Sequence, residues 1–145
     1  MARIKLEVPA TTIAVVQVPV RITDINYGNH VGNDAFVGII HEARMQWLAA
    51  NGYTELDIEG IGLIMSDIVV EFRNESFYGD TINATLSIGE ITKAGFELYY
   101  RLSTKRNNTD IILANAKTGM ICFDYTVKKV VALPEKLKLL LGASL

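Results

Sequence analysis

The amino-acid sequence predicts an α+β fold in which a curved antiparallel β-sheet wraps around one long central helix. One long apolar helix follows the first strand-like segment, most of the remaining chain is strand-like, and turn-forming residues separate these segments. A helix that is apolar over most of its circumference needs cover on several sides, and a curved sheet supplies that cover. We therefore expect residues 1–145 to form a single domain of this architecture.

The first strand is predicted from Thr12 to Thr23, because β-branched residues dominate this segment. Pro19 has no backbone N–H to donate, which indicates an edge strand or a bulge. A polar segment with Gly28 and Gly32 follows, and these glycines permit backbone conformations that other residues resist.

The long helix is predicted from Asp34 to Ala50. Asn33 or Asp34 is its expected N-cap, and the pair Asn51-Gly52 is a suitable stop. Its apolar residues cover much of the circumference: Phe36, Ile39, Ile40, Ala43, Met45, Trp47 and Leu48.

The rest of the chain is predicted to form an antiparallel meander of about four strands, followed by a short amphipathic helix. Turn-forming residues separate the strands, and alternating apolar residues from Phe96 to Leu102 are typical of a strand with one buried face. The predicted strands are Leu63–Phe72, Asp80–Glu90, Gly95–Ser103 and Ile111–Val127, and the helix is Leu133–Leu141.

Composition excludes several classes of function. The formal net charge is -2 and no long basic run occurs, so a nucleic-acid partner is not expected. No run is long and apolar enough to span a bilayer, and no signal peptide is evident, which predicts a cytoplasmic protein without a membrane partner. Half of the residues are hydrophobic, a proportion that hints at self-association.

Cysteine and histidine are too few to build a metal site. Cys122 is the only cysteine, so no intramolecular disulfide can form, and a buried apolar role is expected for it. The two histidines, His30 and His41, cannot form a closed metal site by themselves.

The segment from Val20 to Phe36 reads VRITDINYGNHVGNDAF and carries the most information about function. It resembles the signature of hot-dog thioesterases of the hydroxybenzoyl-CoA and short-chain acyl-CoA type, in which D-x-D precedes a G-H-V-N-N-x-x-Y-like run. Asp24 matches the first acid, His30-Val31 match H-V, and Asn33 matches the second asparagine. The aromatic residue of the pattern corresponds to Phe36.

The resemblance extends over nearly the whole chain. Ala43-Arg44 match the ending of the E-x-A-R motif, and His41 stands where that motif has its glutamate. The segment Val69–Ile82 is similar to the basic residue and G-D turn that follow the family's second strand. The resemblance implies a hot-dog fold, a homodimer or homotetramer, and sites built between two subunits.

The chain departs from the pattern at the catalytic position. Asn26 replaces the second acid of D-x-D, which the resemblance implies to be the catalytic carboxylate. An amide cannot accept a proton or form an anhydride, but it can donate a hydrogen bond to a thioester carbonyl or hold a water. Asn29 also stands where the family has glycine, with Gly28 one residue earlier.

Several residues could supply the missing base. Asp24 and Asn26 would point to the same face if the strand continued that far, so Asp24 could activate a water that Asn26 orients. His30 titrates near neutrality by nature, and Glu42 lies on the helix that carries the catalytic acid in another branch of the family. The helix N-terminus offers unpaired N–H groups to an oxyanion.

Each candidate also has a structural interpretation. Asp24 could cap the loop, Asn26 could be a turn residue, and His30 could hold the backbone. Glu42 and Arg44 could form an ion pair at a dimer interface. Other residues expected to contact the substrate are Tyr27, Gly28, Val31, Gly32, Asn33 and Arg73, although Arg73 could equally form a surface salt bridge.

The predicted function is therefore hydrolysis of an acyl-CoA or acyl-carrier-protein thioester by an activated water, without a metal or a bound cofactor. Coenzyme A would be present only as part of the substrate. A non-catalytic acyl-thioester binding protein is the main alternative, since Asn26 replaces the family carboxylate. A dehydratase acting on 3-hydroxyacyl thioesters is a weaker third possibility.

Overall fold

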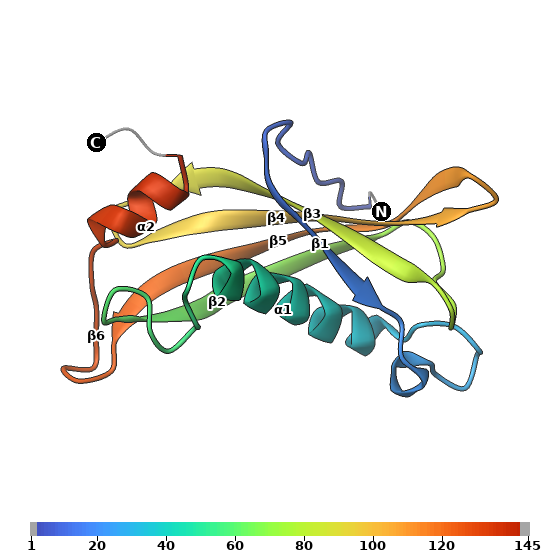
Figure 1. Ribbon diagram of the computed structural model, residues 1–145, viewed down its shortest axis with the longest axis horizontal. Helices are drawn as coiled ribbons and strands as arrows, with labels where there is room; N and C mark the ends of the chain where they lie inside the picture. The colour runs from blue at the N-terminus through green and yellow to red at the C-terminus, as the bar shows by residue number, and fades with distance from the viewer. Residues whose placement is uncertain (1–2, 143–145) are drawn as a thin grey trace.

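A computed structural model describes residues 3–142, and their strands form one antiparallel sheet of six strands. The long helix α1 lies along one side of this sheet (Figure 1). The elements in chain order are β1 (Thr12–Pro19), a 3₁₀ turn (Ile22–Asp24), α1 (Asn33–Ala50), β2 (Gly62–Phe72), β3 (Thr81–Ile91), β4 (Gly95–Arg106), β5 (Thr109–Asp124), β6 (Lys129–Val130) and α2 (Glu135–Leu140).

The predicted meander is correct for three strands and wrong for the fourth. The strands lie in the order β1-β3-β4-β5-β2, so β3, β4 and β5 follow one another while β2 pairs with β5 at the far edge. Because β1 occupies the other side of β3, β2 cannot lie there, and the connection from β2 to β3 crosses the end of the sheet. The short β6, which pairs with the end of β5, was not predicted.

The first strand ends earlier than predicted. It stops at Pro19, and the chain then turns through the 3₁₀ segment instead of continuing to Thr23. The edge position predicted from Pro19 is confirmed, because β1 pairs only with β3. Since the strand ends here, the condition under which Asp24 and Asn26 would share one strand face is not met.

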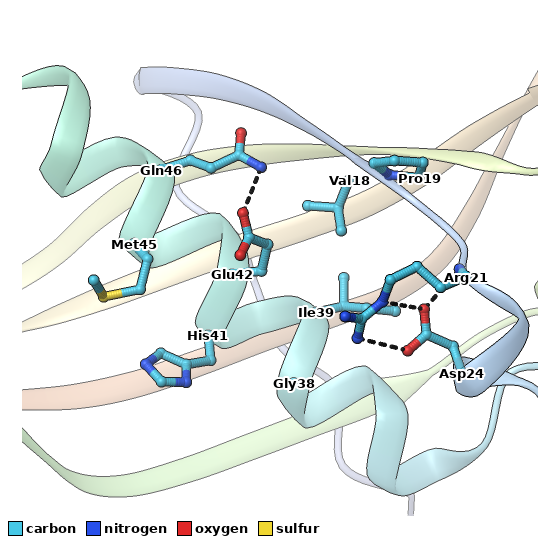
Figure 2. A pocket seen from close by; sticks show the side chains of 10 residues that line it. All are labelled: Val18, Pro19, Arg21, Asp24, Gly38, Ile39, His41, Glu42, Met45 and Gln46. Carbon is cyan, nitrogen blue, oxygen red and sulfur yellow. Dashed lines mark hydrogen bonds and ion pairs between the residues drawn. The ribbon is translucent and has the colours of Figure 1, made fainter.

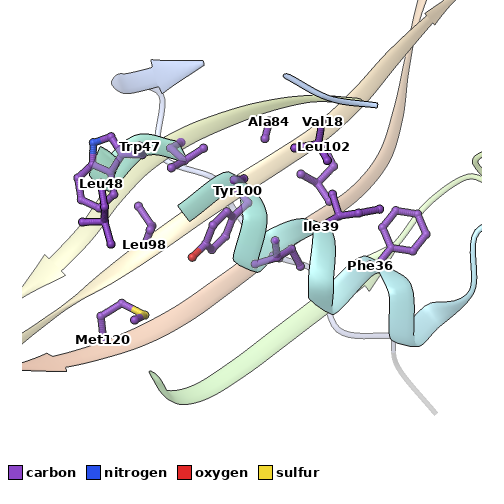
Figure 3. Close-up of a cluster of buried hydrophobic side chains, with 14 of the residues drawn as sticks. Val18, Phe36, Ile39, Trp47, Leu48, Ala84, Leu98, Tyr100, Leu102 and Met120 are labelled. Carbon is purple, nitrogen blue, oxygen red and sulfur yellow. The ribbon is translucent and has the colours of Figure 1, made fainter. Parts of the chain in front are cut away.

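The helix α1 has the predicted length and packs one broad face on the sheet (Figure 3). Phe36 meets Phe72 of β2 edge to face at 5.5 Å between ring centroids, and Trp47 meets Phe96 of β4 at 6.4 Å. The N-cap is Gly32 rather than Asn33 or Asp34, and it makes no side-chain cap. The opposite face of α1 is exposed in the single chain, so one sheet covers fewer sides than expected.

A buried polar chain joins α1 to the sheet. Arg44 donates to the Tyr100 hydroxyl at 3.1 Å, and that hydroxyl lies 2.7 Å from the Thr118 hydroxyl. On the other side, Arg44 lies 3.6 Å from Glu55. Arg44 is therefore bound within its own chain, and Glu42 accepts from Gln46 at 2.8 Å.

Cys122 is fully buried, as expected from the sequence. Desolvation raises the pKa of its thiol to about 11, so the thiolate needed for nucleophilic chemistry does not form near neutral pH. Among residues 3–142, no helix is long and apolar enough to cross a membrane.

Candidate active site

The loop between the 3₁₀ turn and α1 is held closed by its own backbone. The Asn26 N–H donates to the His30 carbonyl at 2.9 Å, and the Asn29 N–H donates to the Asn26 carbonyl at 3.1 Å. The Val31 N–H donates to Ser76 at 2.8 Å, which ties the loop to the chain after β2. These backbone hydrogen bonds therefore hold the loop in one conformation directly before the helix.

Asn29 explains how this turn closes without the expected glycine. Its φ is 66°, in the left-handed region that glycine occupies most easily. Asparagine is one of the few other residues that tolerate this conformation, because its short polar side chain can bond locally. The displacement of glycine to position 28 therefore leaves the turn intact.

The turn engages only the oxygen of the Asn26 side chain. Its Oδ1 accepts from the Gly28 N–H at 2.9 Å, the pattern of an Asx turn. Its Nδ2 donates to no atom of residues 3–142 and is free to bond a ligand carbonyl. Asn26 is thus both a turn residue and a candidate hydrogen-bond donor.

His30 is oriented by the backbone that follows it. Its Nδ1 lies 3.1 Å from the Val31 carbonyl oxygen, and a carbonyl can only accept, so Nδ1 carries the proton of a neutral ring. The other nitrogen, Nε2, then holds a lone pair. A Cβ placed on Gly28 would lie 3.3 Å from His30 Nε2 and 3.2 Å from Asn26 Oδ1. Both side chains therefore converge beside Gly28.

A small pocket of about 180 Å³ opens beside His30 at the start of α1. It brings together three of the residues predicted to contact substrate, Val31, Asn33 and Arg73, along with His30. The first helical bond runs from the Phe36 N–H to Gly32, so the N–H groups that precede Phe36 in α1 are not used by the helix. The remaining lining residues are Phe36, Phe72, Asn74 and Glu75.

Asp24 and Glu42 lie in a different pocket, of about 370 Å³, between β1 and α1 (Figure 2). The carboxylate of Asp24 faces Arg21, and Glu42 points toward Gln46, which donates to it at 2.8 Å. The structure thus divides the four catalytic candidates: Asn26 and His30 converge, while Asp24 and Glu42 are apart from them. Tyr27 is fully exposed at the loop tip, and Gly32 underlies the helix start.

Two supporting groups escaped prediction. The backbone carbonyl of Ser76 accepts from the loop, and a backbone acceptor cannot be recognised from the type of residue that carries it. His41 lies 2.6 Å from Glu55, which also approaches the buried Arg44. This pairing joins α1 to the following loop. It could not be predicted, because the two residues are 14 positions apart in the sequence.

Comparisons with known proteins agree on one family and one fold. A model of the thioesterase-like superfamily matches residues 20–141. A 1,4-dihydroxy-2-naphthoyl-CoA hydrolase from Microcystis aeruginosa is 29% identical over 109 residues, which are 73% of this chain and 76% of that protein.

Two CoA thioesterases are among the solved structures that are similar to this one. A 1,4-dihydroxy-2-naphthoyl-CoA thioesterase from Synechocystis has a TM-score of 0.77 at 21% identity, covering 88% of this chain and 94% of its own. A 4-hydroxybenzoyl-CoA thioesterase has a TM-score of 0.77 at 15% identity, covering 88% and 96%. The latter is an aspartate-to-asparagine variant in complex with 4-hydroxybenzoyl-CoA. These likenesses confirm the predicted hot-dog fold.

Proposed function

Because the chain belongs to the thioesterase-like superfamily, we propose that it hydrolyses an acyl-CoA thioester. Water adds to the thioester carbonyl, the carbon–sulfur bond breaks, and the products are a carboxylic acid and the free thiol of coenzyme A. The named relatives support this reaction, since one is a CoA hydrolase and the others are CoA thioesterases. No metal or bound cofactor takes part in the proposed reaction.

His30 is the base in this proposal. Its Nε2 accepts a proton from the attacking water and later returns it to the departing thiolate. The observation that carries the assignment is the bond from Nδ1 to Val31, which leaves Nε2 basic and directed at Gly28, beside Asn26. Asp24 and Glu42 are less suited, because they lie in the other pocket and already accept hydrogen bonds there.

Asn26 and the start of α1 act on the carbonyl. The free Nδ2 of Asn26 donates to the thioester oxygen or orients the water, a role that does not require a charge. The unused N–H groups of Asn33, Asp34 and Ala35 point along the helix axis, where its positive dipole end lies. They stabilise the oxyanion of the tetrahedral intermediate.

The acyl group in this proposal is aromatic. The pocket beside His30 is lined by Phe36 and Phe72, whose edge-to-face pair offers further contact to a flat ring. The relatives named above act on dihydroxynaphthoyl-CoA and hydroxybenzoyl-CoA, which agrees with such a pocket. An acyl-carrier-protein thioester remains an alternative form of the same substrate class.

The first experiment is a thiol-release assay of the native protein with short-chain, long-chain and aromatic acyl-CoAs. We expect turnover, fastest on an aromatic thioester. His30→Gln is expected to abolish most of it, while His41→Gln, which alters the other histidine, retains it. Turnover that survives in His30→Gln would reject His30 as the base, and no turnover on any thioester would reject the hydrolase proposal.

A non-catalytic thioester-binding protein is the second candidate. The observation that favours it is the solved aspartate-to-asparagine variant of the hydroxybenzoyl-CoA enzyme, which holds its thioester. Asn26 gives this chain the same residue type naturally. If the native protein is inert and Asn26→Asp gains hydrolysis, the chain is a binder. If the native protein turns over and Asn26→Asp gains little, asparagine is part of a working site.

We also propose self-association into a homodimer or homotetramer. Within residues 3–142, β2 has a strand partner on one edge only and carries the exposed Met65, and the exposed face of α1 carries Val37. Unpaired strand edges and exposed apolar side chains are commonly covered by a second subunit. Sedimentation at micromolar concentration tests this, and a monomer at all concentrations would reject it.

A further inference from the structure

The extended segment that precedes β1 crosses the face of the sheet opposite to α1 (Figure 1). The alternation of β2 shows which face this is: Phe72 packs on the helix, so Glu71 and Arg73 point to the other side. Arg3 donates to the Phe72 carbonyl at 2.7 Å, and the Leu6 N–H donates to Glu71 at 3.1 Å. The segment is therefore fastened to the carboxyl end of β2.

A pocket of about 370 Å³ lies between this segment and the end of β2. Arg3, Lys5 and Arg73 contribute three cationic side chains to its wall, and Glu7 and Glu71 contribute two acidic ones. The pocket therefore carries a net positive charge in a protein whose overall charge is negative.

The buried acid of this pocket is already satisfied. Glu71 accepts from the Leu6 N–H, lies 3.5 Å from Asn115 Nδ2, and pairs with Arg73 at 3.4 Å. The hydrogen bond from Leu6 is the largest influence that lowers the pKa of Glu71, so this carboxylate stays charged. Within residues 3–142, neither Arg3 nor Lys5 forms an ion pair, and the charge of Arg3 is the smallest of the influences that act on the pKa of Glu71. Both cations can therefore bind an anion.

Arg73 connects this pocket to the candidate active site. It lines both the basic pocket and the smaller pocket that contains His30 and Asn33. Because Arg73 borders both pockets, the two pockets are neighbours at the end of β2. A ligand that occupies both would need a reacting carbonyl at one end and anionic groups at the other. Coenzyme A has this form, because its phosphate groups lie at the far end of the pantetheine arm.

We propose that Arg3 and Lys5, with Arg73, form a phosphate subsite that binds the nucleotide end of coenzyme A. This assignment rests on the proposed thioesterase function and makes the chain selective for CoA thioesters. Guanidinium and ammonium groups bind phosphate oxygens through charge-assisted hydrogen bonds. A carrier protein presents a single phosphodiester at this distance, so it would gain less from three cations.

The test compares two thioesters of one aromatic acid, the acyl-CoA and the phosphate-free acyl-pantetheine. In the double variant Arg3→Gln/Lys5→Gln, KM for the acyl-CoA is expected to rise about tenfold with kcat unchanged. KM for the acyl-pantetheine should stay the same. Lys129→Gln, an exposed lysine in β6, is the matched control and should change neither value.

Two kinetic outcomes would overturn the subsite. Equal KM for acyl-CoA in the native and double-variant proteins means that the cations do not meet phosphate. An equal rise for both thioesters means that the segment matters for structure and not for phosphate binding. Raising the salt concentration should increase the native KM for acyl-CoA more than that of the double variant.

A binding measurement separates this proposal from the hydrolase proposal. Free coenzyme A is titrated calorimetrically into the native protein and into the double variant, without any turnover. Weaker binding by the double variant supports the subsite even if no thioester is hydrolysed. Equal binding, or no binding to the native protein, overturns the subsite even if hydrolysis is observed.

Discussion

The carboxylate of Asp24 is bound by Arg21, three residues earlier in the chain. Asp24 Oδ2 accepts from the Arg21 backbone N–H at 2.8 Å, and Oδ1 lies 3.1 Å from the guanidinium. The Asp24 side chain is 6% exposed, whereas that of Arg21 is 72% exposed. These bonds close the 3₁₀ turn that ends the first strand. The loop-capping interpretation of Asp24 thus has direct structural support, and a free base does not.

Asp24→Asn should therefore weaken the fold more than the chemistry. The amide keeps the size of the carboxylate but loses the charged acceptor, which we expect to cost about 1–2 kcal/mol of unfolding free energy. In the folded protein, kcat should remain within about threefold of the native value, because Asp24 does not contact the reacting atoms. A threefold change corresponds to well under 1 kcal/mol in the activation free energy of hydrolysis. Urea unfolding and thiol release measure the two effects.

The matched change on the partner is Arg21→Gln. Because the Arg21 side chain is mostly in solvent, its loss should lower the unfolding free energy less than Asp24→Asn does. A fall in kcat of about a hundredfold in Asp24→Asn, with unfolding unchanged, would contradict the capping role and restore Asp24 as the base.

His30→Gln is expected to lower kcat by about 10²- to 10⁴-fold, the usual effect of removing a general base. Glutamine can still donate to the Val31 carbonyl, so the loop should keep its shape. Thiol release measures kcat, and urea unfolding checks that the variant is folded. A folded variant that keeps the native kcat would place the base elsewhere.

The order of the longer elements could be predicted because each of them has a local signal. The helix α1 was found almost to the residue, since its apolar period and the Asn51-Gly52 stop lie within the segment itself. The place of β2 in the sheet could not be predicted in the same way. It depends on which edge of β3 is already taken by β1, a contact between residues far apart in sequence.

The candidate site shows the same limit, because contacts between residues far apart in sequence could not be predicted. The resemblance singled out the segment from Val20 to Phe36, but the grouping of its side chains could not be predicted. Whether Asp24 faces Asn26 depends on where the first strand ends, and that in turn depends on the 3₁₀ turn after Pro19. The link from Val31 to Ser76 uses only backbone atoms, which no side-chain pattern reports.

Position 29 provides a test of the backbone at the site. Asn29→Gly should leave the unfolding free energy within about 0.5 kcal/mol, because glycine adopts a positive φ without strain. Asn29→Val should cost about 1–2 kcal/mol or more, because a β-branched residue is strained in the left-handed region. We also expect lower kcat in Asn29→Val, since His30 follows directly. Similar urea midpoints for the two variants would contradict this account of the turn.

Asp80 and Arg106 should govern part of the loss of stability in acid. Asp80 accepts from Arg106 Nη2 at 2.6 Å and from the Phe77 N–H at 2.9 Å, which fixes the turn before β3. Burial alone would raise the pKa of Asp80, but these hydrogen bonds outweigh it and hold that pKa below its ordinary value. A carboxylate with a lowered pKa stabilises the fold fully above the unfolded pKa of about 3.9. That stabilisation is lost as the pH falls through the lower, folded value.

Arg106→Gln removes the strongest of these donors and should bring the pKa of Asp80 closer to its unfolded value. The difference in unfolding free energy between native and variant proteins should then be largest near neutral pH and shrink as the pH falls below about 4. Lys105→Gln is the control, because Lys105 pairs with Asp110 in solvent at 4.0 Å and should cost little at any pH. Urea unfolding from pH 7 to pH 3 measures both variants. A native–variant difference that stays constant across this range would mean that Arg106 stabilises the turn through packing on Phe77, 4.9 Å from its guanidinium, rather than through the charge of Asp80.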